Sequence, residues 1–469
     1  MSAPLFKAHP ADRPMRGTMG VGDSELRSLL IQGSDGGPMP LTWGQGNMWD
    51  SMTALGSESE RLNVSWSIPL KGGVAVTEAF DRIGRLLSCL DIFRVSFDAE
   101  RVEQAFRSDA GIEVRVTEVA ADAASARREV NTRKDPACVD LASKAFGMRE
   151  SPLRLGLQHV RGIVMQIDVA MSHLGFDGGS YRPLDRLLRD AVEGRGISAV
   201  GMQTEELVEY EQSADQVRRS DAVINGWLAA SSRLPPGRGL MAMTPGRYSV
   251  TILRSRAAAV AVQALAVRHG VSASGIVVSA LTEVIRRHLY SELSALLVVC
   301  SNRSHPRLTD FVGQTIGNGL LVLPSRDPGG RFVDYAKETY ARTLLTYSRA
   351  RYDCLKWRDA LTDLTARGLA TDLTYYFNDV RSDRGTWSGL ERRLPDLKGL
   401  LEETSVATVG RRDLGDATLF ADLGSHGQEL TLQVVCDDTR ISSSDVVSVL
   451  TAFENLLVIE ALESGTHLT

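Results

Sequence analysis

Hydrophobic and polar residues follow two different patterns along the chain. Residues 63–70 alternate between the two types, as a half-buried strand does, and β-type residues run through 163–170. Residues 76–90 and 444–462 carry apolar side chains on one helical face, which is typical of an amphipathic helix. Segments of both kinds alternate along the sequence, and this order predicts an α/β fold in which helices cover sheets.

Other segments extend this prediction to the rest of the chain. Apolar runs bounded by turn residues predict a hairpin within residues 90–106 and a strand over 151–157 that pairs with 163–170. We also expect helices over residues 120–133, 205–228, 257–269 and 274–288. Both halves of the chain therefore contain strands and helices.

The length of the chain indicates more than one domain. A chain of 469 residues is too long for one ordinary hydrophobic core, so two domains or lobes are expected. We divide it into a loose lead-in (1–24), an N-terminal lobe (25–190) and a C-terminal lobe (191–469). Within the last we expect a Pro- and Gly-rich linker over 230–240 and a polar crossing segment near 380–400.

Composition narrows the class of protein. Hydrophobic residues make up 43% and charged residues 24%, as in a globular protein, and the formal net charge of −5 argues against a nucleic-acid partner. The five cysteines form no C-x-x-C pair, which favours reduced thiols in the cytoplasm over a disulfide framework or a zinc site. No signal-peptide pattern and no apolar run of membrane-spanning length is present, so we expect neither secretion nor a membrane partner.

The segment from Met171 to Ser180 carries the strongest chemical signal. A β-type run leads into His173, Asp177 follows four residues later, and Gly178-Gly179 precedes apolar positions at helical spacing. This order predicts a strand, a tight loop and a helix, with an imidazole at the end of the strand. Such a group can transfer protons near neutral pH. Taken alone, however, so short a motif more often marks a buried structural histidine.

Several common catalytic and cofactor motifs are absent from the sequence. There is no G-x-S-x-G, no G-x-G-x-x-G and no P-loop, and no other histidine has a partner at metal-ligand spacing. Ser172 adjoins His173, and in a strand the two side chains would point to opposite faces. A serine nucleophile, a dinucleotide cofactor and a bound metal are therefore not expected.

Several motifs occur in order along the chain around the core segment Ser172-His173-Leu174-Gly175-Phe176-Asp177-Gly178. They are Leu41-Thr42-Trp43-Gly44-Gln45 through Met48-Trp49, Asp91 through Phe97, Gln104, Pro152-Leu153-Arg154, Asn302-Arg303, and Val312-Gly313 with Asn318. Over roughly residues 25–465, these ordered motifs resemble the condensation domains of nonribosomal peptide synthetases, within the chloramphenicol-acetyltransferase-like superfamily, whose core motif is H-H-x-x-x-D-G. Together they are far more specific than any one motif.

This resemblance implies a fold and a set of residue roles. The fold would be two acetyltransferase-like lobes forming a V-shaped pseudo-dimer with a central tunnel. His173 would either take a proton from the attacking nucleophile or orient it, and the N–H of Gly178 would face the oxyanion. Asp177, paired with Arg303, would hold the loop, although Asp177 could also merely end a turn. Ser172 would support the site structurally, and Asn378 and Asn318 would be weaker candidates for lining the tunnel.

The resemblance also implies a reaction and partners. A free-standing condensation enzyme would transfer an acyl or aminoacyl group from a carrier-protein or CoA thioester to an amine, in natural-product (antibiotic) biosynthesis. No cofactor would be bound, because phosphopantetheine of a carrier protein docking in trans, or CoA, would present the donor. A hydroxyl acceptor would give an ester instead. Ser172 replaces the first histidine of the core motif, which keeps a non-catalytic module that recruits a partner enzyme as an alternative.

Overall fold

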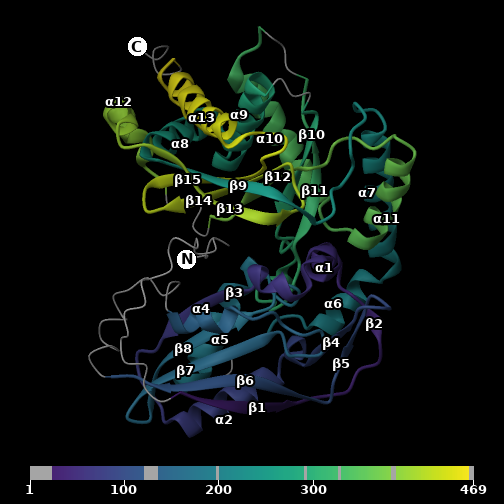
Figure 1. Ribbon diagram of the computed structural model, residues 1–469, viewed down its shortest axis with the longest axis vertical. Coiled ribbons are helices and arrows are strands. Elements are labelled where there is room, and N and C mark those ends of the chain that lie inside the picture. The colour runs from purple at the N-terminus through teal and green to yellow at the C-terminus, as the bar shows by residue number, and fades with distance from the viewer. Residues whose placement is uncertain are drawn as a thin grey trace. The chain divides into compact units, whose positions relative to one another are not determined.

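The structure, a computed structural model, describes residues 24–120, 136–196, 200–289, 293–325, 329–381 and 387–463. Their chain forms two compact units (Figure 1). The N-terminal unit comprises the described residues up to Val217 together with Ser301–Ile316, and the C-terminal unit comprises Arg218–Cys300 and the described residues from Gly317 onward. The expected lead-in (but for Ser24) and the expected helix over 120–133 (but for Ala120) lie outside the described residues.

The N-terminal unit is built on a five-stranded sheet. In spatial order its strands are β1 (Ser24–Gln32), β6 (Asp109–Glu118), β7 (Leu153–Val160), β8 (Ile163–Met171) and β3 (Val64–Pro69). β6 and β7 are parallel, and the other neighbours are antiparallel. A smaller sheet joins β2 (Met39–Pro40), β5 (Glu103–Phe106) and β4 (Val95–Asp98). The predicted pairing of β7 with β8 and the predicted hairpin of β4 and β5 are confirmed.

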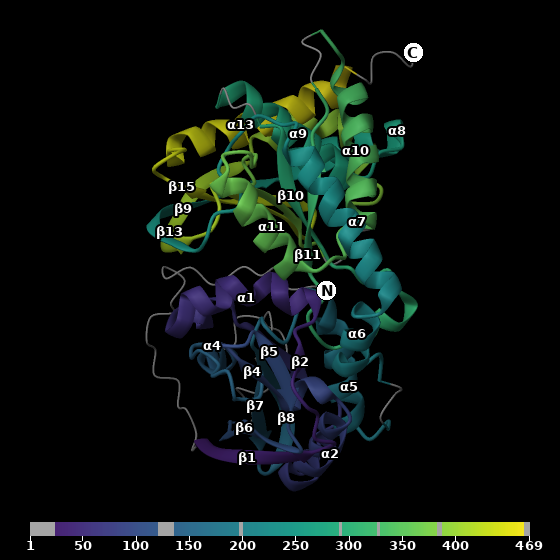
Figure 2. The ribbon, with the colours of Figure 1, turned by 90° about the vertical axis from the view of Figure 1, so that its right-hand side faces the viewer.

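Helices pack on both faces of this sheet. Leu155 and Val169 point into the main core, where α2 (Val76–Ser88) and α5 (Tyr181–Val192) place their buried leucines. α4 (Pro136–Ala142) packs near the other face, over Gly156. Figure 2 shows these elements together with α1 (Trp43–Leu55) and α6 (Thr204–Glu211). The N-terminal unit therefore holds β8 rigidly between two neighbouring strands, and β8 leads into the candidate site.

The C-terminal unit is built on a seven-stranded sheet. In spatial order its strands are β11 (Gly317–Val322), β10 (Ala295–Cys300), β12 (Tyr375–Asp379), β14 (Leu419–His426), β15 (Glu429–Asp437), β9 (Thr244–Ser255) and β13 (Ser405–Gly415). One face packs on α8 (Arg256–His269), α9 (Ala273–His288), α10 (Phe332–Ser348), α12 (Leu397–Leu401) and α13 (Ser443–Glu463). α7 (Ala214–Ser231) and α11 (Cys354–Ala366) form a second cluster with Leu297 and Leu320 (Figure 1).

One chain segment belongs to a different unit from the strands that flank it. β10 and β11 form an antiparallel pair in the C-terminal unit, and Cys300 lies opposite Gly317 at its end. The sixteen residues between them, Ser301–Ile316, belong to the N-terminal unit. The N-terminal unit is thus assembled from two separate stretches of sequence.

Two features differ from the sequence-based division. The single helix expected over 205–228 is two helices, α6 and α7, which are separated at Gln212 and Ser213. The unit boundary lies after Val217 and not after residue 190. The expected linker over 230–240 lies entirely in the C-terminal unit, where Gly237 N donates to Ala370 O (2.7 Å) and Gly239 N to Thr371 O (2.8 Å). These backbone hydrogen bonds make a Pro- and Gly-rich stretch part of a packed surface. The described part of the expected crossing segment, 380–381 and 387–400, also lies in this unit.

Membrane-spanning helices were sought by length and composition. Within the described ranges, no single helix is long and apolar enough to cross a membrane. Only α8 and α9 taken together satisfy those two criteria, and the pair is bent by 113°.

Candidate active site

The candidate site is the loop that follows β8. The strand ends at Met171, and Ser172 N then donates to the carbonyl of Pro152 (2.9 Å), at the start of β7. Gly175 approaches Pro152 so closely that a Cβ atom there would lie 2.9 Å from the proline Cβ. Beyond Asp177, a short 3₁₀ turn (Gly178–Ser180) leads into α5. The predicted order of strand, loop and helix is confirmed.

Among the described residues, one ring nitrogen of His173 has hydrogen-bond partners and the other has none. Its side chain is 6% exposed, and its Nδ1 lies 2.6 Å from the carbonyl oxygen of Phe176. Since a carbonyl can only accept, the proton must reside on Nδ1. Nε2 is then the basic nitrogen, and no described residue forms a hydrogen bond with it. Burial lowers the pKa of the imidazole below its ordinary value, against the opposing effects of the Phe176 carbonyl and Asp177. The ring is therefore neutral near pH 7.

Asp177 is fully occupied by donors. Its Oδ1 accepts from Arg303 Nη2 (2.6 Å) and from Ser180 N (3.0 Å). Its Oδ2 accepts from Thr315 N (2.9 Å), and the Thr315 hydroxyl lies at 2.7 Å. A carboxylate held in this way is a structural centre and has little capacity left to accept a proton from a substrate. The structure thus shows the Asp177–Arg303 ion pair that the family resemblance implied.

Arg303 ties the loop to the segment Ser301–Ile316. Besides Asp177, its guanidinium donates to the carbonyls of Phe311 (2.7 Å) and Leu308 (3.1 Å) and to the Ser180 hydroxyl (2.7 Å). Ser180 also exchanges hydrogen bonds with the backbone of Gly313, at 2.7 and 3.0 Å. The start of α5 is therefore fixed to this segment by side chains as well as by the ion pair.

The sequence assigned no role to three residues that contribute to this cluster. They are Ser180, Gln314 and Thr315. Gln314 Nε2 donates to the carbonyl of His173 at 2.8 Å. The only sequence signal for Gln314 and Thr315 was their place between Gly313 and Asn318 in the V-G…N segment. The motif itself consists of Val312, Gly313 and Asn318, so it indicated no role for the residues between them.

Ser172 and Gly178 occupy different environments in the loop. Ser172 is buried, and its hydroxyl accepts from Leu174 N (3.4 Å), so it supports the local turn. Gly178 is exposed, and a Cβ atom built there would meet nothing within 4 Å. Its N–H donates to no described residue. The amide is therefore available to an incoming group.

Asn318 and Asn378 lie in the C-terminal unit, and their place along a substrate tunnel stays a prediction. The carbonyl of Asn318 accepts from the Tyr352 hydroxyl (2.7 Å). The side chain of Asn378 donates to Asp422 Oδ1 (2.9 Å) from the neighbouring strand. Desolvation raises the pKa of the Asp422 carboxyl to about 6, and the amide of Asn378 opposes that shift.

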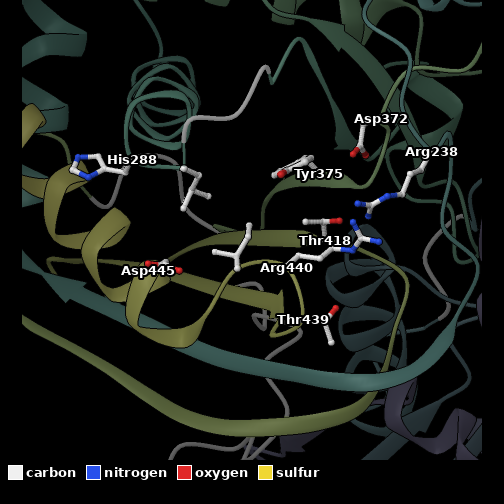
Figure 3. A pocket seen from close by; sticks show the side chains of 10 residues that line it. Arg238, His288, Asp372, Tyr375, Thr418, Thr439, Arg440 and Asp445 are labelled. Carbon is white, nitrogen blue, oxygen red and sulfur yellow. The ribbon is translucent and has the colours of Figure 1, made fainter.

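A separate pocket of about 600 Å³ lies within the C-terminal unit. Figure 3 shows Arg238 and Arg440 near Asp372 and Thr418, with His288 and Asp445 on the opposite side. None of the candidate site residues lines it. Apart from the histidine, its wall carries two arginines and two aspartates, so its charge does not select a ligand of one sign. In the described ranges, no three His, Cys, Asp or Glu side chains are grouped to hold a metal ion.

Comparisons with known proteins relate this architecture to one fold. No family model and no curated protein matches the sequence. Solved structures do match. The condensation domain of the monacolin K polyketide synthase MokA has a TM-score of 0.64 at 14% identity, covering 92% of this chain and 98% of that chain.

Two further structures agree over similar lengths. SgcC5 of Streptomyces globisporus has a TM-score of 0.62 at 14% identity and covers 90% of this chain and 98% of its own. The starter condensation domain of rhizomide synthetase RzmA, in complex with C8-CoA and Leu-SNAC, has a TM-score of 0.62 at 13% identity, with coverages of 91% and 94%. The fold of this chain is therefore that of the condensation domains, with two chloramphenicol-acetyltransferase-like lobes.

Proposed function

We propose that this chain is a free-standing acyltransferase that joins an acyl or aminoacyl thioester to an amine and forms an amide in natural-product biosynthesis. It would act in the cytoplasm, and the donor would be held on the phosphopantetheine of a carrier protein docking in trans, or on CoA. The observation that carries this proposal is His173, a neutral imidazole whose Nε2 has no partner among the described residues. The condensation-domain fold and the C8-CoA complex of RzmA support it.

The proposed reaction needs one base and accurate positioning. As the amine nitrogen attacks the thioester carbonyl, Nε2 of His173 takes the proton that the nitrogen loses. The tetrahedral intermediate then expels the thiolate, and the imidazolium returns the proton to sulfur. The products are an amide and a free thiol, and the enzyme is regenerated. Because a thioester is already activated, positioning supplies most of the remaining rate enhancement.

Gly178 would stabilise the intermediate. Its N–H, which donates to no described residue, lies at the start of the turn that follows Asp177, five residues from His173. A backbone donor placed in this way can bind the oxyanion of a tetrahedral intermediate. A hydroxyl acceptor would use the same two groups and yield an ester.

Mass spectrometry tests the proposal directly. The purified chain is incubated with CoA thioesters, acyl-loaded carrier proteins and a panel of amines and alcohols. We expect mass gain on an acceptor together with loss of acyl mass from the donor, and amides should predominate over esters. A panel in which no acceptor gains acyl mass above the enzyme-free rate contradicts the proposal.

The activity should persist at pH values where an ordinary histidine is protonated. Because burial lowers the pKa of His173, the neutral base remains populated as the pH falls through 6.5, and the acid limb of kcat/KM should have its midpoint below 6.5. The same shift makes the free energy of unfolding depend on pH. The contribution of His173 is fully present above its unfolded-state pKa and decreases as the pH falls through its folded-state pKa. Initial rates between pH 4.5 and 8 measure this limb, and a midpoint at or above about 6.5 would contradict it.

Substitution of Gly178 should separate catalysis from stability. Gly178→Val fills space that is empty in the protein, so the melting temperature should stay unchanged. If the thioester carbonyl approaches the amide, kcat/KM should fall about 10- to 100-fold, because small misplacements of reacting groups are costly. Gly179→Ala is the contrasting variant, since its Cβ would overlap the Arg303 guanidinium and lower the melting temperature. Unchanged kinetics in Gly178→Val would remove Gly178 from the mechanism.

A second candidate function is recruitment of a partner enzyme without catalysis. The observation that favours it is Ser172, which stands where the family has the first histidine of the core motif. Among the described residues, its hydroxyl bonds only to the backbone N–H of Leu174. This function requires a stable complex that survives substitution of His173. Co-purification with candidate synthetase partners would detect it.

A further inference from the structure

Gln314 connects the segment Ser301–Ile316 to the backbone that carries the imidazole. It is 1% exposed, and its Nε2 lies 2.8 Å from the carbonyl of His173 and 3.3 Å from that of Phe176. We infer that Gln314 is a positioning residue for His173, which fixes the two carbonyls around the ring and so keeps Nε2 of the imidazole as the basic nitrogen. This inference rests on the proposed function.

The hydrogen-bond inventory assigns the direction of each contact. The Nδ1–H of His173 donates to Phe176 O, so Nδ1 cannot also accept from Gln314, although the two nitrogens lie only 3.3 Å apart. The two amide hydrogens of Gln314 are therefore left for the carbonyls. The orientation of the amide is itself fixed, because its Oε1 accepts from Ile316 N at 3.0 Å.

Gln314 is the only described donor to the carbonyl of His173. Among the described residues, the carbonyl of Phe176 accepts only from His173 and Gln314. Without Gln314, one of these buried carbonyls would lose its partner and the other would keep only the imidazole. If the peptide groups rotated to give these carbonyls other hydrogen-bond donors, the Phe176 carbonyl would turn away from Nδ1. No other described contact would then select the tautomer of His173.

The backbone of Gln314 is held from both sides. Gly313 and Thr315, its neighbours, bond to Ser180 and Asp177. On the other side, α1 packs so closely that a Cβ atom at Gly44 would overlap the carbonyl of Gln314. The side chain of Gln314 thus reaches the histidine from a backbone that is held in place, as a positioning residue requires.

Two substitutions test the inference. Gln314→Met keeps the size of the side chain but donates nothing, and kcat should fall about 10- to 100-fold with KM within about twofold. Gln314→Glu changes one group and places a carboxylate oxygen near Nδ1–H, which favours the imidazolium, so the acid limb of the pH profile should move to higher pH. A protein labelled with ¹⁵N in its histidines reports the tautomer directly. The signature of a protonated Nδ1 should be clear in the unsubstituted chain and mixed in Gln314→Met.

Gln104→Met is the matched control. Gln104 is also 1% exposed in the N-terminal unit, where it donates to Pro40 O and accepts from Gln45, both at 3.0 Å. It should lose stability to a similar degree as Gln314→Met while keeping the ¹⁵N signature of His173 and the pH profile. This comparison separates positioning from the general cost of losing buried hydrogen bonds.

The outcomes distinguish the inference from the function on which it rests. If either Gln314 variant leaves kcat, the pH profile and the ¹⁵N signature unchanged while loss of His173 inactivates the chain, the positioning role is wrong and the proposed function stands. If loss of His173 leaves the rate unchanged, the proposed function fails, and a catalytic positioning role for Gln314 fails with it. A tautomer change in Gln314→Met together with a selective loss of kcat supports both.

Discussion

Substitution of His173 with Ala should lower kcat/KM for acyl transfer by about 10²- to 10⁴-fold, which is the usual contribution of a general base. Nε2 is the only basic nitrogen in the loop, and Asp177 is already occupied by Arg303 and Thr315 and cannot replace it. The variant also loses the hydrogen bond to Phe176. Steady-state rates with the best donor and acceptor pair measure the loss, and circular dichroism checks the fold.

His159→Ala provides the matched control in the same unit. His159 lies at the end of β7, where its Nδ1 accepts from Gly162 N at 3.2 Å, so its loss should leave the rate within about twofold. If His173→Ala retains the full rate, the catalytic role is wrong. A partner complex that survives in that variant would then favour recruitment as the function.

Substitution of Asp177 with Ala should cost about 3–5 kcal/mol of unfolding free energy, because it leaves a charge buried without its partner. The Arg303 side chain is 10% exposed and that of Asp177 is 1% exposed, so solvent cannot replace the lost contact. Activity should be abolished as well, since Thr315 and Ser180 lose their common acceptor and the loop that carries His173 is released. Urea unfolding and hydrogen exchange across residues 171–181 and 301–316 measure both effects.

A double-mutant cycle identifies the ion pair as the cause. Asp177→Ala combined with Arg303→Met should lower the unfolding free energy by less than the sum of the single changes. The reason is that no unpaired charge remains once both side chains are replaced. Asp379→Ala is the control in the other unit, where Asp379 pairs with Arg381 at the same distance of 2.6 Å and is also buried. It should destabilise the chain without raising exchange around His173. Additive costs in the cycle would show that the two side chains act separately.

Hydrophobic periodicity predicted the strands that have an apolar face toward the core and a more polar face opposite. β7 and β8 were expected and are paired, because Leu155 and Val169 repeat on the core side. β1 was missed, since its first five residues are exposed and Leu26 and Leu30 face solvent at 62% and 60%. β13 was missed for a similar reason, because it has no fully buried residue and is defined by its pairing with β9. Strands at the edge of a sheet carry little pattern of their own.

The site was predictable only where a motif marked it. His173 and Asp177 follow a strand and precede glycines, so local sequence indicated them. Arg303 is 126 residues from Asp177, and only the order of motifs linked the two. Gln314 and Thr315 contact the loop through hydrogen bonds over a comparable separation. Amphipathic periodicity carries no information about such bonds, and for this reason these two residues became visible only in the structure.

The assembly of the N-terminal unit from two stretches of sequence limits how lobes can be recombined. A chimera with a single crossover after Val217 would combine a His173 loop from one parent with the residues 301–316 of the other. Its Asp177, His173 and Ser180 would then depend on a foreign segment for Arg303, Gln314 and Thr315. Functional exchange of this lobe therefore requires three junctions, after Val217, Cys300 and Ile316, so that the segment between β10 and β11 is inherited with the histidine that it supports.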